Sequence, residues 1–309
     1  MTAAPHQQVP DLDDAIADLR AARDAWRRED GGRHSVAHFP SHIEVERAIG
    51  DLVVALFPGR LGGYAGDGAG EDAFVASALR RALTILQRQV ASELAYWQEE
   101  AAHAFDPSHA AMIVRLFVAE LGSIREMVDA DVRAAFLGDP AARSADEILI
   151  CYPGIVAMLH HRIAHALYNL GAPIVARIVS ELANTRTGID IHPGATIGRG
   201  VFIDHGTGVV IGETAVIGAR VRVYQAVTLG AKRFPTDAEG KLQKGLPRHP
   251  IVEDDVVIYA GATILGRITL GKGAVIGGNV WLTHDVPAGG RIAQAESRSG
   301  ALANGIGAS

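Results

Sequence analysis

The sequence predicts an α+β protein in which an N-terminal bundle of α-helices precedes a parallel β-helix of six-residue repeats. The first observation behind this prediction is an apolar spacing of about 3.6 residues over residues 11–183, which is typical of amphipathic helices. The second is that this spacing stops after Thr187, where aliphatic residues begin to recur at every sixth position. The predicted domains are, in chain order, a helical domain (1–185), a β-helix domain (186–290) and a C-terminal tail (291–309).

The helical half is predicted from its periodicity and from the signals that start and stop helices. Ser41 followed by Glu44 has the spacing of a capping box, and Gly171 is placed to end a helix. Residues 58–70 contain six glycines and a proline, so we expect a loop there. We interpret this half as a bundle used for assembly rather than as a second catalytic domain. The expected helices cover residues 11–28, 41–57, 72–105, 107–137, 153–170 and 173–183.

The second half has a regular six-residue repeat with two apolar positions in each unit. Three such hexapeptides make one triangular coil of a parallel β-helix, in which the aliphatic residue points inward and neighbouring coils stack. A phase that holds over six consecutive repeats is a strong signal for this architecture. The aliphatic positions are Ile191, Ile197, Ile203, Ile211, Ile217, Val223, Leu229, Val252, Ile258, Ile264, Leu270, Ile276 and Leu282.

Two interruptions of the repeat are the expected places for chemistry, because repeat proteins accommodate insertions as loops on one face. The first separates two aliphatic positions by eight residues instead of six, and it contains Asp204 and His205. The second is a polar insertion, residues 231–248, which ends in Arg248 and is followed by His249. Both breaks are rich in polar residues and each is associated with a histidine, which favours a functional interpretation over plain surface loops.

Composition and charge exclude several classes of protein. The chain has 309 residues, 48% of them hydrophobic and 21% charged, which fits a globular protein with two structural units. The net charge of −6 and the lack of a basic run argue against nucleic-acid binding. Cys151 is the only cysteine, so the chain encodes neither an internal disulfide nor a thiolate zinc site. Residues 1–14 lack the features of a signal peptide, and no stretch is apolar enough to span a membrane, so we expect a cytoplasmic protein.

Motifs around the two interruptions, together with two motifs upstream of them, match one known family. They are Asp139-Pro140-Ala141, His161-Arg162-Ile163-Ala164-His165, Asp190-Ile191-His192-Pro193, Asp204-His205-Gly206-Thr207-Gly208, Ile211-Gly212-Glu213-Thr214, Val227-Thr228-Leu229-Gly230 and Arg248-His249-Pro250. Over residues 138–286 the sequence resembles bacterial serine O-acetyltransferases, a family of hexapeptide-repeat acyltransferases. The resemblance implies a β-helix that coils left-handed, against the usual right-handed preference of parallel crossovers. It also implies transfer of acetyl from acetyl-CoA to the hydroxyl of L-serine, giving O-acetyl-L-serine and CoA, the first step of cysteine biosynthesis from serine.

His205 is the candidate general base for this reaction. A serine hydroxyl is a poor nucleophile at neutral pH and needs a base within hydrogen-bond reach as it attacks the thioester carbonyl. Imidazole suits that role because it titrates near neutrality. The resemblance implies that Asp190 orients the imidazole, as a carboxylate on the second ring nitrogen would do. The sequence names no donor for the thioester oxyanion.

The resemblance also implies which residues bind the amino acid. Arg248 and His249 would hold the carboxylate of serine as cationic donors. Asp139 and Asp204 would hold its ammonium group as anions. This arrangement of charges would explain selectivity for an amino acid, because a plain sugar acceptor needs neither charged pair.

Further implications concern the coenzyme and the assembly. Acetyl-CoA is the expected co-substrate and would lie in a groove between coils of adjacent subunits, beside the small residues Ala260 and Gly278. No metal is expected to be required. The architecture and the resemblance together predict a homotrimer or a dimer of trimers with active sites between subunits. L-cysteine, which resembles serine, is the expected feedback inhibitor.

Three departures from the family pattern affect these expectations. Residues 290–300 lack the usual Gly-Xaa-Pro-Ala-basic segment near the coenzyme, and residues 1–50 form an N-terminal extension. In the family, a C-terminal isoleucine inserts into the active site of O-acetylserine sulfhydrylase. The ending Asn304-Gly305-Ile306-Gly307-Ala308-Ser309 does not favour that complex.

Three rival functions share the fold. A hexapeptide acetyltransferase for a sugar, an antibiotic or another hydroxyl acceptor would keep the same coil. A γ-type carbonic anhydrase would need three histidines that converge on zinc, and the spacing of His192, His205 and His249 does not suit that site. A non-catalytic scaffold is disfavoured by the presence of both Asp190 and His205. The i, i+4 pair His161 and His165 fits a packed helix face better than a metal site.

Overall fold

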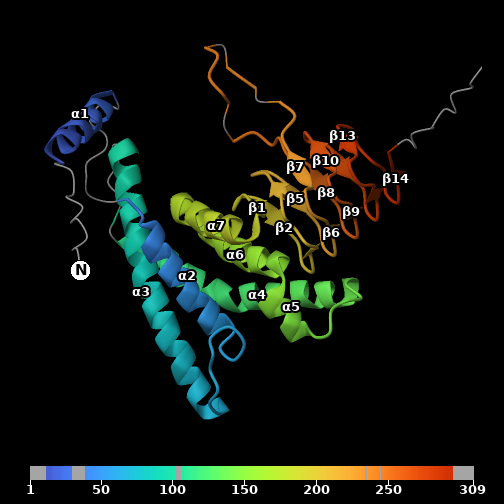
Figure 1. The fold of residues 1–309 in the computed structure, drawn as a ribbon, viewed down its shortest axis with the longest axis horizontal. Coiled ribbons are helices and arrows are strands. Elements are labelled where there is room, and N and C mark those ends of the chain that lie inside the picture. Colours follow the sequence, from blue (N-terminus) through green and yellow to red (C-terminus); the bar gives the residue numbers. More distant parts are fainter. Residues whose placement is uncertain are drawn as a thin grey trace, which may run out of the picture.

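The computed structural model describes residues 12–29, 39–101, 106, 108–233, 235–237, 239–243 and 245–294 (Figure 1). Within these ranges, the predicted helical bundle followed by a parallel β-helix is confirmed. The helices are α1 (Asp13–Glu29), α2 (His42–Leu56), α3 (Gly68–Ala101), α4 (Ser108–Gly138), α5 (Ala145–Cys151), α6 (Pro153–Asn169) and α7 (Pro173–Thr187). None of these helices is both long and apolar enough to cross a membrane.

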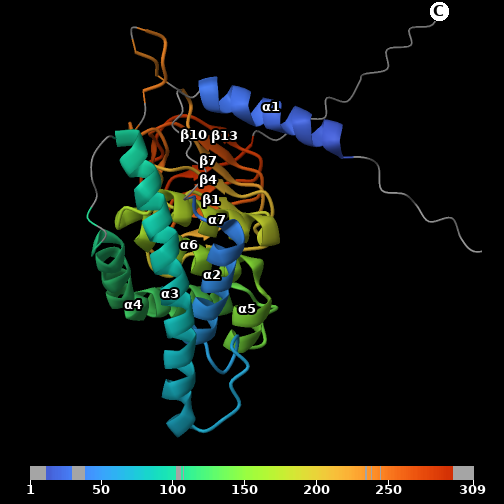
Figure 2. The ribbon, with the colours of Figure 1, turned by 90° about the vertical axis from the view of Figure 1, so that its left-hand side faces the viewer.

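Helices α2 and α5 each start where a serine side chain accepts from a free backbone amide, whereas α6 and α7 start at a proline. The Ser41 hydroxyl accepts from the amide of Glu44, as the sequence predicted. Helix α5 was not predicted, although Ser144 and Glu147 have the same spacing. The Ser144 hydroxyl accepts from the amide of Glu147 at 3.0 Å, and the Glu147 carboxylate accepts from the amide of Arg143 at 2.7 Å. Helix α1 lies apart from the bundle, and none of its residues is buried (Figure 2).

The β-helix has three parallel sheets whose strands are contributed by successive coils. The first sheet contains β1 (Asp190–Ile191), β4 (Val210–Ile211), β7 (Thr228–Gly230), β10 (Thr263–Leu265) and β13 (Trp281–Leu282). The second contains β2 (Thr196–Ile197), β5 (Val216–Ile217), β8 (Ile251–Val252) and β11 (Thr269–Leu270). The third contains β3 (Phe202–Ile203), β6 (Arg222–Val223), β9 (Val257–Ile258), β12 (Val275–Ile276) and β14 (Arg291–Ile292). The second residue of each strand from β1 to β13 carries the predicted aliphatic side chain, which is buried in a continuous column.

The strand register accounts for both interruptions of the repeat. Val210 pairs with Thr228, three hexapeptides further along the chain. Asp190 instead pairs with Val210, so the first coil holds two extra residues. Thr228 pairs with Thr263, so the coil between them carries the polar insertion. The coils around the insertion therefore stack without a change of register.

Two of the three corners of the β-helix carry the predicted site residues. The His205 corner is where the chain passes from the third sheet to the first, and it consists of residues 204–209, 224–227, 259–262 and 277–280. The His249 corner is where the chain passes from the first sheet to the second, and it consists of residues 192–195, 212–215, 248–250, 266–268 and 283–285. These corners are separate edges of the triangular coil.

The helices are fastened to the β-helix by a buried ion pair. Arg162 of α6 forms an ion pair with Asp131 of α4 at 3.2 Å, and both side chains are buried. The Arg162 guanidinium also donates to the carbonyl oxygens of Ile197 and Gly198 in the first coil. Asp131 accepts from the amide of Val201 at 3.0 Å. The pair therefore joins two helices to one turn of the β-helix.

Candidate active site at two corners of the coil

The two extra residues of the first coil expose His205. At this corner, successive coils each contain one residue with left-handed backbone, and a buried residue follows it directly. These left-handed residues are Gly208, Ala226, Gly261 and Asn279. His205 adds a further left-handed position, with φ of +58°, which is uncommon for a residue with a side chain. Its imidazole is 72% exposed, and its Nε2 lies 3.9 Å from Asp204 Oδ1. An exposed imidazole beside a carboxylate can accept a proton from a bound hydroxyl.

Asp204 is held in place by a cation that the sequence analysis did not single out. Arg222 donates to Asp204 Oδ2 at 2.6 Å, and the Asp204 side chain is only 10% exposed. The Arg222 guanidinium lies 5.0 Å from the ring centre of Phe202 and 4.7 Å from that of Tyr224. Phe202 pairs with Arg222 in the parallel register, so it is the alignment of β3 with β6 that places this cation beside Asp204. The predicted ammonium ligand Asp204 therefore already has one charged partner.

Asp139 reaches the same corner from the end of α4. Its carboxylate accepts from the Tyr152 hydroxyl at 2.6 Å and from the amide of Ala141 at 2.8 Å. The Tyr152 hydrogen bond, followed by the Ala141 amide, lowers the pKa of Asp139, and the charges of Arg222 and His205 act in the same direction. The reciprocal hydrogen bond raises the pKa of Tyr152 to about 12. The structure thus brings Asp139 and Asp204 to the corner that carries His205.

The structure does not join Asp190 to His205 by a hydrogen bond within the described residues. Asp190 starts β1, and its carboxylate is close enough to α7 to interact with Arg177 and Glu181. Burial raises the pKa of Asp190, Arg177 opposes this shift and Glu181 adds to it. The role of Asp190 in orienting His205 therefore stays a prediction.

The predicted coenzyme residues lie at the His205 corner. The amide of Asn279 donates to the Ala260 carbonyl at 2.9 Å, so the turns that contain Ala260 and Gly278 stack on neighbouring coils. A Cβ atom at Gly278 would approach that same carbonyl to 3.1 Å. The tail after residue 294, where the sequence departs from the family pattern, is outside the described residues. No cluster of histidine, cysteine and acidic side chains suited to a metal occurs in the described ranges.

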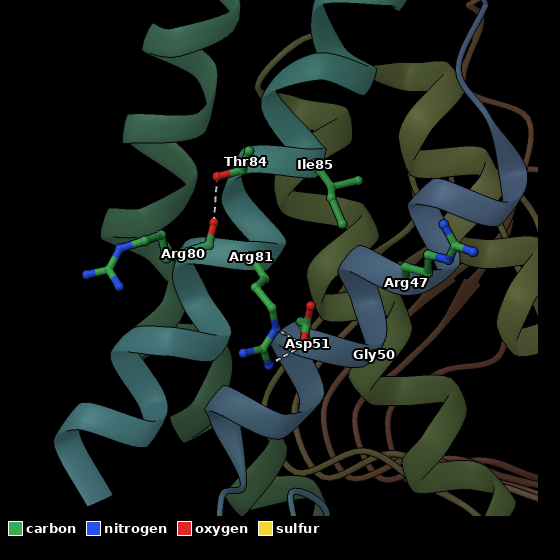
Figure 3. A pocket seen from close by; sticks show the side chains of 7 residues that line it. All are labelled: Arg47, Gly50, Asp51, Arg80, Arg81, Thr84 and Ile85. Atoms are coloured by element: carbon green, nitrogen blue, oxygen red, sulfur yellow. Dashed lines mark hydrogen bonds and ion pairs between the residues drawn. The ribbon is translucent and has the colours of Figure 1, made fainter. Parts of the chain in front are cut away.

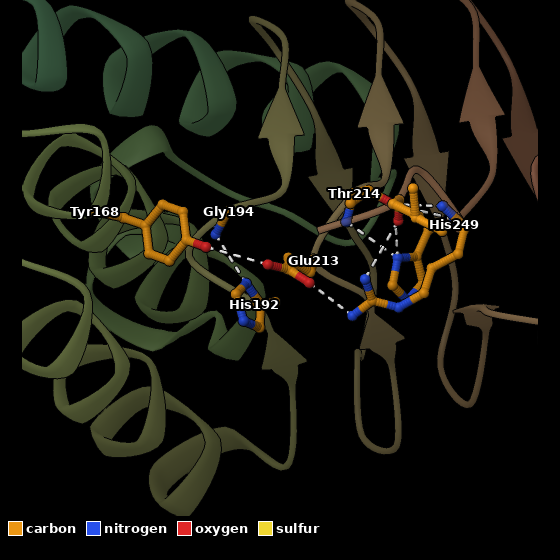
Figure 4. A network of polar contacts seen from close by, with 8 residues as sticks. Tyr168, His192, Gly194, Glu213, Thr214 and His249 are labelled. Carbon is orange, nitrogen blue, oxygen red and sulfur yellow. Dashed lines mark hydrogen bonds and ion pairs between the residues drawn. The ribbon is translucent and has the colours of Figure 1, made fainter. Parts of the chain in front are cut away.

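The His249 corner holds a connected set of polar side chains (Figure 4). Arg248 donates to Glu213 Oε2 at 2.6 Å, and the Tyr168 hydroxyl donates to Glu213 Oε1 at 3.2 Å. The His249 ring contacts the hydroxyl of Thr214 through Nδ1 at 2.9 Å. Burial is the main factor that lowers the pKa of His249, followed by the charge of Arg248. Arg248 and His249 are therefore fixed side by side, as a site for a carboxylate requires.

A cavity of about 330 Å³ lies between this corner and the insertion. Glu213 and Arg248 line one side of it, and the described insertion residues Pro235, Leu242 and Leu246 line another. A larger cavity, of about 670 Å³, lies between α2 and α3 and contains none of the predicted site residues (Figure 3).

Apart from Asp190, the predicted site residues of one chain form two groups. His205, Asp204, Asp139, Ala260 and Gly278 belong to the His205 corner. Arg248 and His249 belong to the His249 corner, which lies at the opposite end of the strands of the first sheet. A single chain therefore presents two half-sites, each with part of the predicted chemistry.

Fold and site together define a hexapeptide-repeat acyltransferase. The family model for bacterial transferase hexapeptide repeats (six repeats) matches residues 249–284. The plasmid-encoded serine acetyltransferase of Synechococcus elongatus is 56% identical over 241 residues, which cover 76% of this chain and 75% of that relative. The chain therefore belongs to the serine acetyltransferase family.

Solved structures give the same result. Serine acetyltransferase 1 of Entamoeba histolytica in complex with L-cysteine has a TM-score of 0.70 and 36% identity, covering 84% of this chain and 90% of that one. The Neisseria gonorrhoeae enzyme in complex with serine has a TM-score of 0.54 and 29% identity, covering 79% and 95%. A serine acetyltransferase in complex with CoA has a TM-score of 0.53 and 28% identity, covering 80% and 97%. These similarities support the predicted left-handed β-helix.

Proposed function

We propose that this chain is a cytoplasmic serine O-acetyltransferase, which transfers acetyl from acetyl-CoA to L-serine and releases CoA. The observation that carries the proposal is the exposed imidazole of His205 on its extended turn, with the carboxylates of Asp139 and Asp204 at the same corner. A chain of this family with such a corner offers a base for the hydroxyl and anions for the ammonium group. Solved relatives bound to serine and to CoA support both substrates.

In the proposed reaction, His205 removes the hydroxyl proton of serine as the oxygen attacks the thioester carbonyl carbon. Collapse of the tetrahedral intermediate breaks the carbon–sulfur bond, and the protonated imidazole returns its proton to the CoA sulfur. In this proposal Asp190 is the carboxylate that stabilises the imidazolium. The pantetheine arm would lie along the turns of Ala260 and Gly278.

We further propose that the active site forms between subunits of a trimer, either alone or paired as a dimer of trimers. Three β-helices packed around a threefold axis would place the His205 corner of one subunit against the His249 corner of its neighbour. Arg248 and His249 would then hold the carboxylate of the serine whose ammonium group meets Asp139 and Asp204.

Two regulatory expectations belong to the same proposal. L-cysteine would compete with serine, because it has the same ammonium and carboxylate groups, and the relative bound to L-cysteine supports this. The complex with O-acetylserine sulfhydrylase is not favoured. A pull-down in which tight binding depends on residues 306–309 would contradict that expectation.

The proposed function is tested by measuring thiol release from acetyl-CoA with L-serine. His205→Ala should lower turnover by roughly 10²–10⁴-fold, as expected for loss of a general base. His284→Ala is the control, because His284 is exposed on the turn after β13 and is not one of the predicted site residues. A wild-type chain that releases no CoA with serine, but does so with a sugar or another hydroxyl compound, would identify the rival acceptor class.

A further inference from the structure

The hydroxyl of Thr214 lies at the centre of the His249 corner. The backbone amides of Arg248 and His249 donate to Thr214 Oγ1, at 2.9 and 3.1 Å. The same oxygen lies 2.9 Å from His249 Nδ1. Thr214 therefore contacts both the backbone and the ring of the dipeptide that the family resemblance assigns to the serine carboxylate.

The hydrogen atoms in this cluster can be assigned by counting donors and acceptors. A threonine hydroxyl has two acceptor positions and one hydrogen. The two backbone amides occupy both acceptor positions, so the hydroxyl hydrogen is free to point at His249 Nδ1. The amide of Thr214 also donates to Nδ1, at 3.0 Å. Since both neighbours are donors, Nδ1 carries no proton, and the ring hydrogen is on Nε2.

The surroundings keep the ring in this orientation. His249 is 7% exposed, and its ring packs over Gly212, where any Cβ atom would collide with the imidazole. Arg267 donates to the carbonyl oxygens of Thr214 and His249, at 2.6 and 3.0 Å. These contacts also link the turn that contains Thr214 to the segment that contains His249. Turning the ring over would put a carbon atom where Nδ1 now accepts from two donors, so both hydrogen bonds would be lost.

We infer that Thr214 is a positioning residue for the amino-acid substrate, which fixes His249 as a neutral imidazole that presents Nε2–H beside Arg248. This inference rests on the proposed function for the identity of the ligand. The substrate carboxylate then meets one cation and one neutral donor, where the sequence analysis expected two cations. Glu213, which accepts from both Arg248 and Tyr168, holds the cation in the same way that Thr214 holds the imidazole.

The kinetic test replaces Thr214 with valine, which keeps the shape and the backbone amide but removes the hydroxyl. We expect kcat/KM for serine to fall about tenfold or more, mainly through KM, because two amides lose their acceptor and Nδ1 loses one of its two donors. The KM for acetyl-CoA should change less than about twofold. Thr214→Ser should restore most of the loss, and Thr283→Val, after β13 further along the same corner, is the matched control.

Two further measurements separate positioning from a general loss of structure. In a His249→Ala background the effect of Thr214→Val should shrink, because the hydroxyl acts largely through the ring. Nitrogen NMR of the wild-type imidazole near pH 7.5 should show His249 with an unprotonated Nδ1 and a protonated Nε2. That spectrum requires no turnover, so it tests the inference even if serine is not the acceptor.

The outcomes are distinct. A protonated Nδ1, a cationic ring near pH 7.5, or a Thr214→Val chain with unchanged KM for serine would each overturn the inference while leaving the proposed function intact. A wild-type chain inactive on serine would overturn the proposed function. The NMR measurement would still test independently which ring nitrogen of His249 carries the proton.

Discussion

At the scale of single residues, the turn that presents His205 depends on Gly206. Its φ of +85° lies in the left-handed region, and a Cβ atom there would collide with Ile189 and Ile203 inside the coil. The two extra residues of this coil are therefore absorbed by a turn that needs glycine next to the histidine. Because Gly206 follows His205 directly, any shift of its backbone changes where the imidazole lies.

This dependence predicts the effect of Gly206→Ala. We expect a loss of stability greater than the roughly 1–2 kcal/mol of left-handed strain alone, together with a lower kcat. Gly273→Ala is the matched control, since Gly273 has φ of +68° with no atom within 4 Å of the added carbon, and it should show only the strain. Urea unfolding and thiol release measure the two effects, and equal behaviour of the variants would refute the prediction.

A second prediction at this scale concerns the pH dependence of stability, and it follows from histidines whose pKa is lowered by burial. His161 is 2% exposed, and neither ring nitrogen has a hydrogen-bond partner among the described residues. Burial lowers its pKa well below the usual value, followed in effect by the charge of Arg162. Burial likewise lowers the pKa of His192 to about 4. In the unfolded chain these rings take up a proton below about pH 6.5, whereas in the folded chain they resist it.

Stability should therefore be fully present above about pH 6.5 and should decrease as the pH falls below it. Each such histidine contributes a loss of up to about 1.4 kcal/mol per pH unit until its folded pKa is reached. His161→Leu should remove part of this acid sensitivity, whereas the exposed His284→Leu should not. Urea unfolding between pH 7.5 and 4.5 measures the slope, and an unchanged slope for His161→Leu would show that the folded chain takes up a proton at His161 as readily as the unfolded chain does.

At the scale of elements, the pair Asp131–Arg162 decides how the helical part sits on the β-helix. It connects α4 and α6 to the carbonyl oxygens between β2 and β3. Breaking a buried pair by removing one partner leaves an uncompensated charge, so Arg162→Met should lower the free energy of unfolding by about 3–5 kcal/mol. Arg220→Met, which breaks an exposed pair with Asp255, should cost less than about 1 kcal/mol. Urea unfolding distinguishes the two, and similar losses would mean that the buried pair is not what fastens the helices.

The elements also show where sequence reasoning succeeded and where it stopped. The strands were predictable because the inward aliphatic position repeats every six residues through β1–β13, apart from the two interruptions. Helix α5 was missed, although its capping box had the same spacing as the one that was recognised at Ser41. The partnership of Arg222 with Asp204 was missed because it links neighbouring coils, and only the register of β3 with β6 reveals it.

At the scale of the whole molecule, the site residues of one chain lie at two corners, and the proposed trimer would join them. This arrangement predicts complementation between two inactive variants. His205→Ala and His249→Ala chains should each be nearly inactive alone. In a mixed trimer, one of the three sites receives both intact corners, so random co-assembly should recover about a quarter of wild-type activity.

The control for complementation is the double variant His205→Ala/His249→Ala, co-assembled in the same way with either single variant. No site then receives both intact corners, so activity should not return. Variants purified as separate trimers and then combined without exchange should also stay inactive. If co-assembled variants show no recovery although mixed trimers are present, each chain would have to supply a complete site of its own.

The sequence by itself determined the class of fold, the position of each coil and the segments that interrupt them, because all of these depend on local periodicity. With the family resemblance it also singled out His205, Asp139, Asp204, Arg248 and His249. Only the tertiary structure decided that these residues form two groups, that Arg222 already occupies one oxygen of Asp204, and that Thr214 fixes the proton on His249. Those properties depend on contacts between coils and between distant helices, which the order of residues along the chain does not contain.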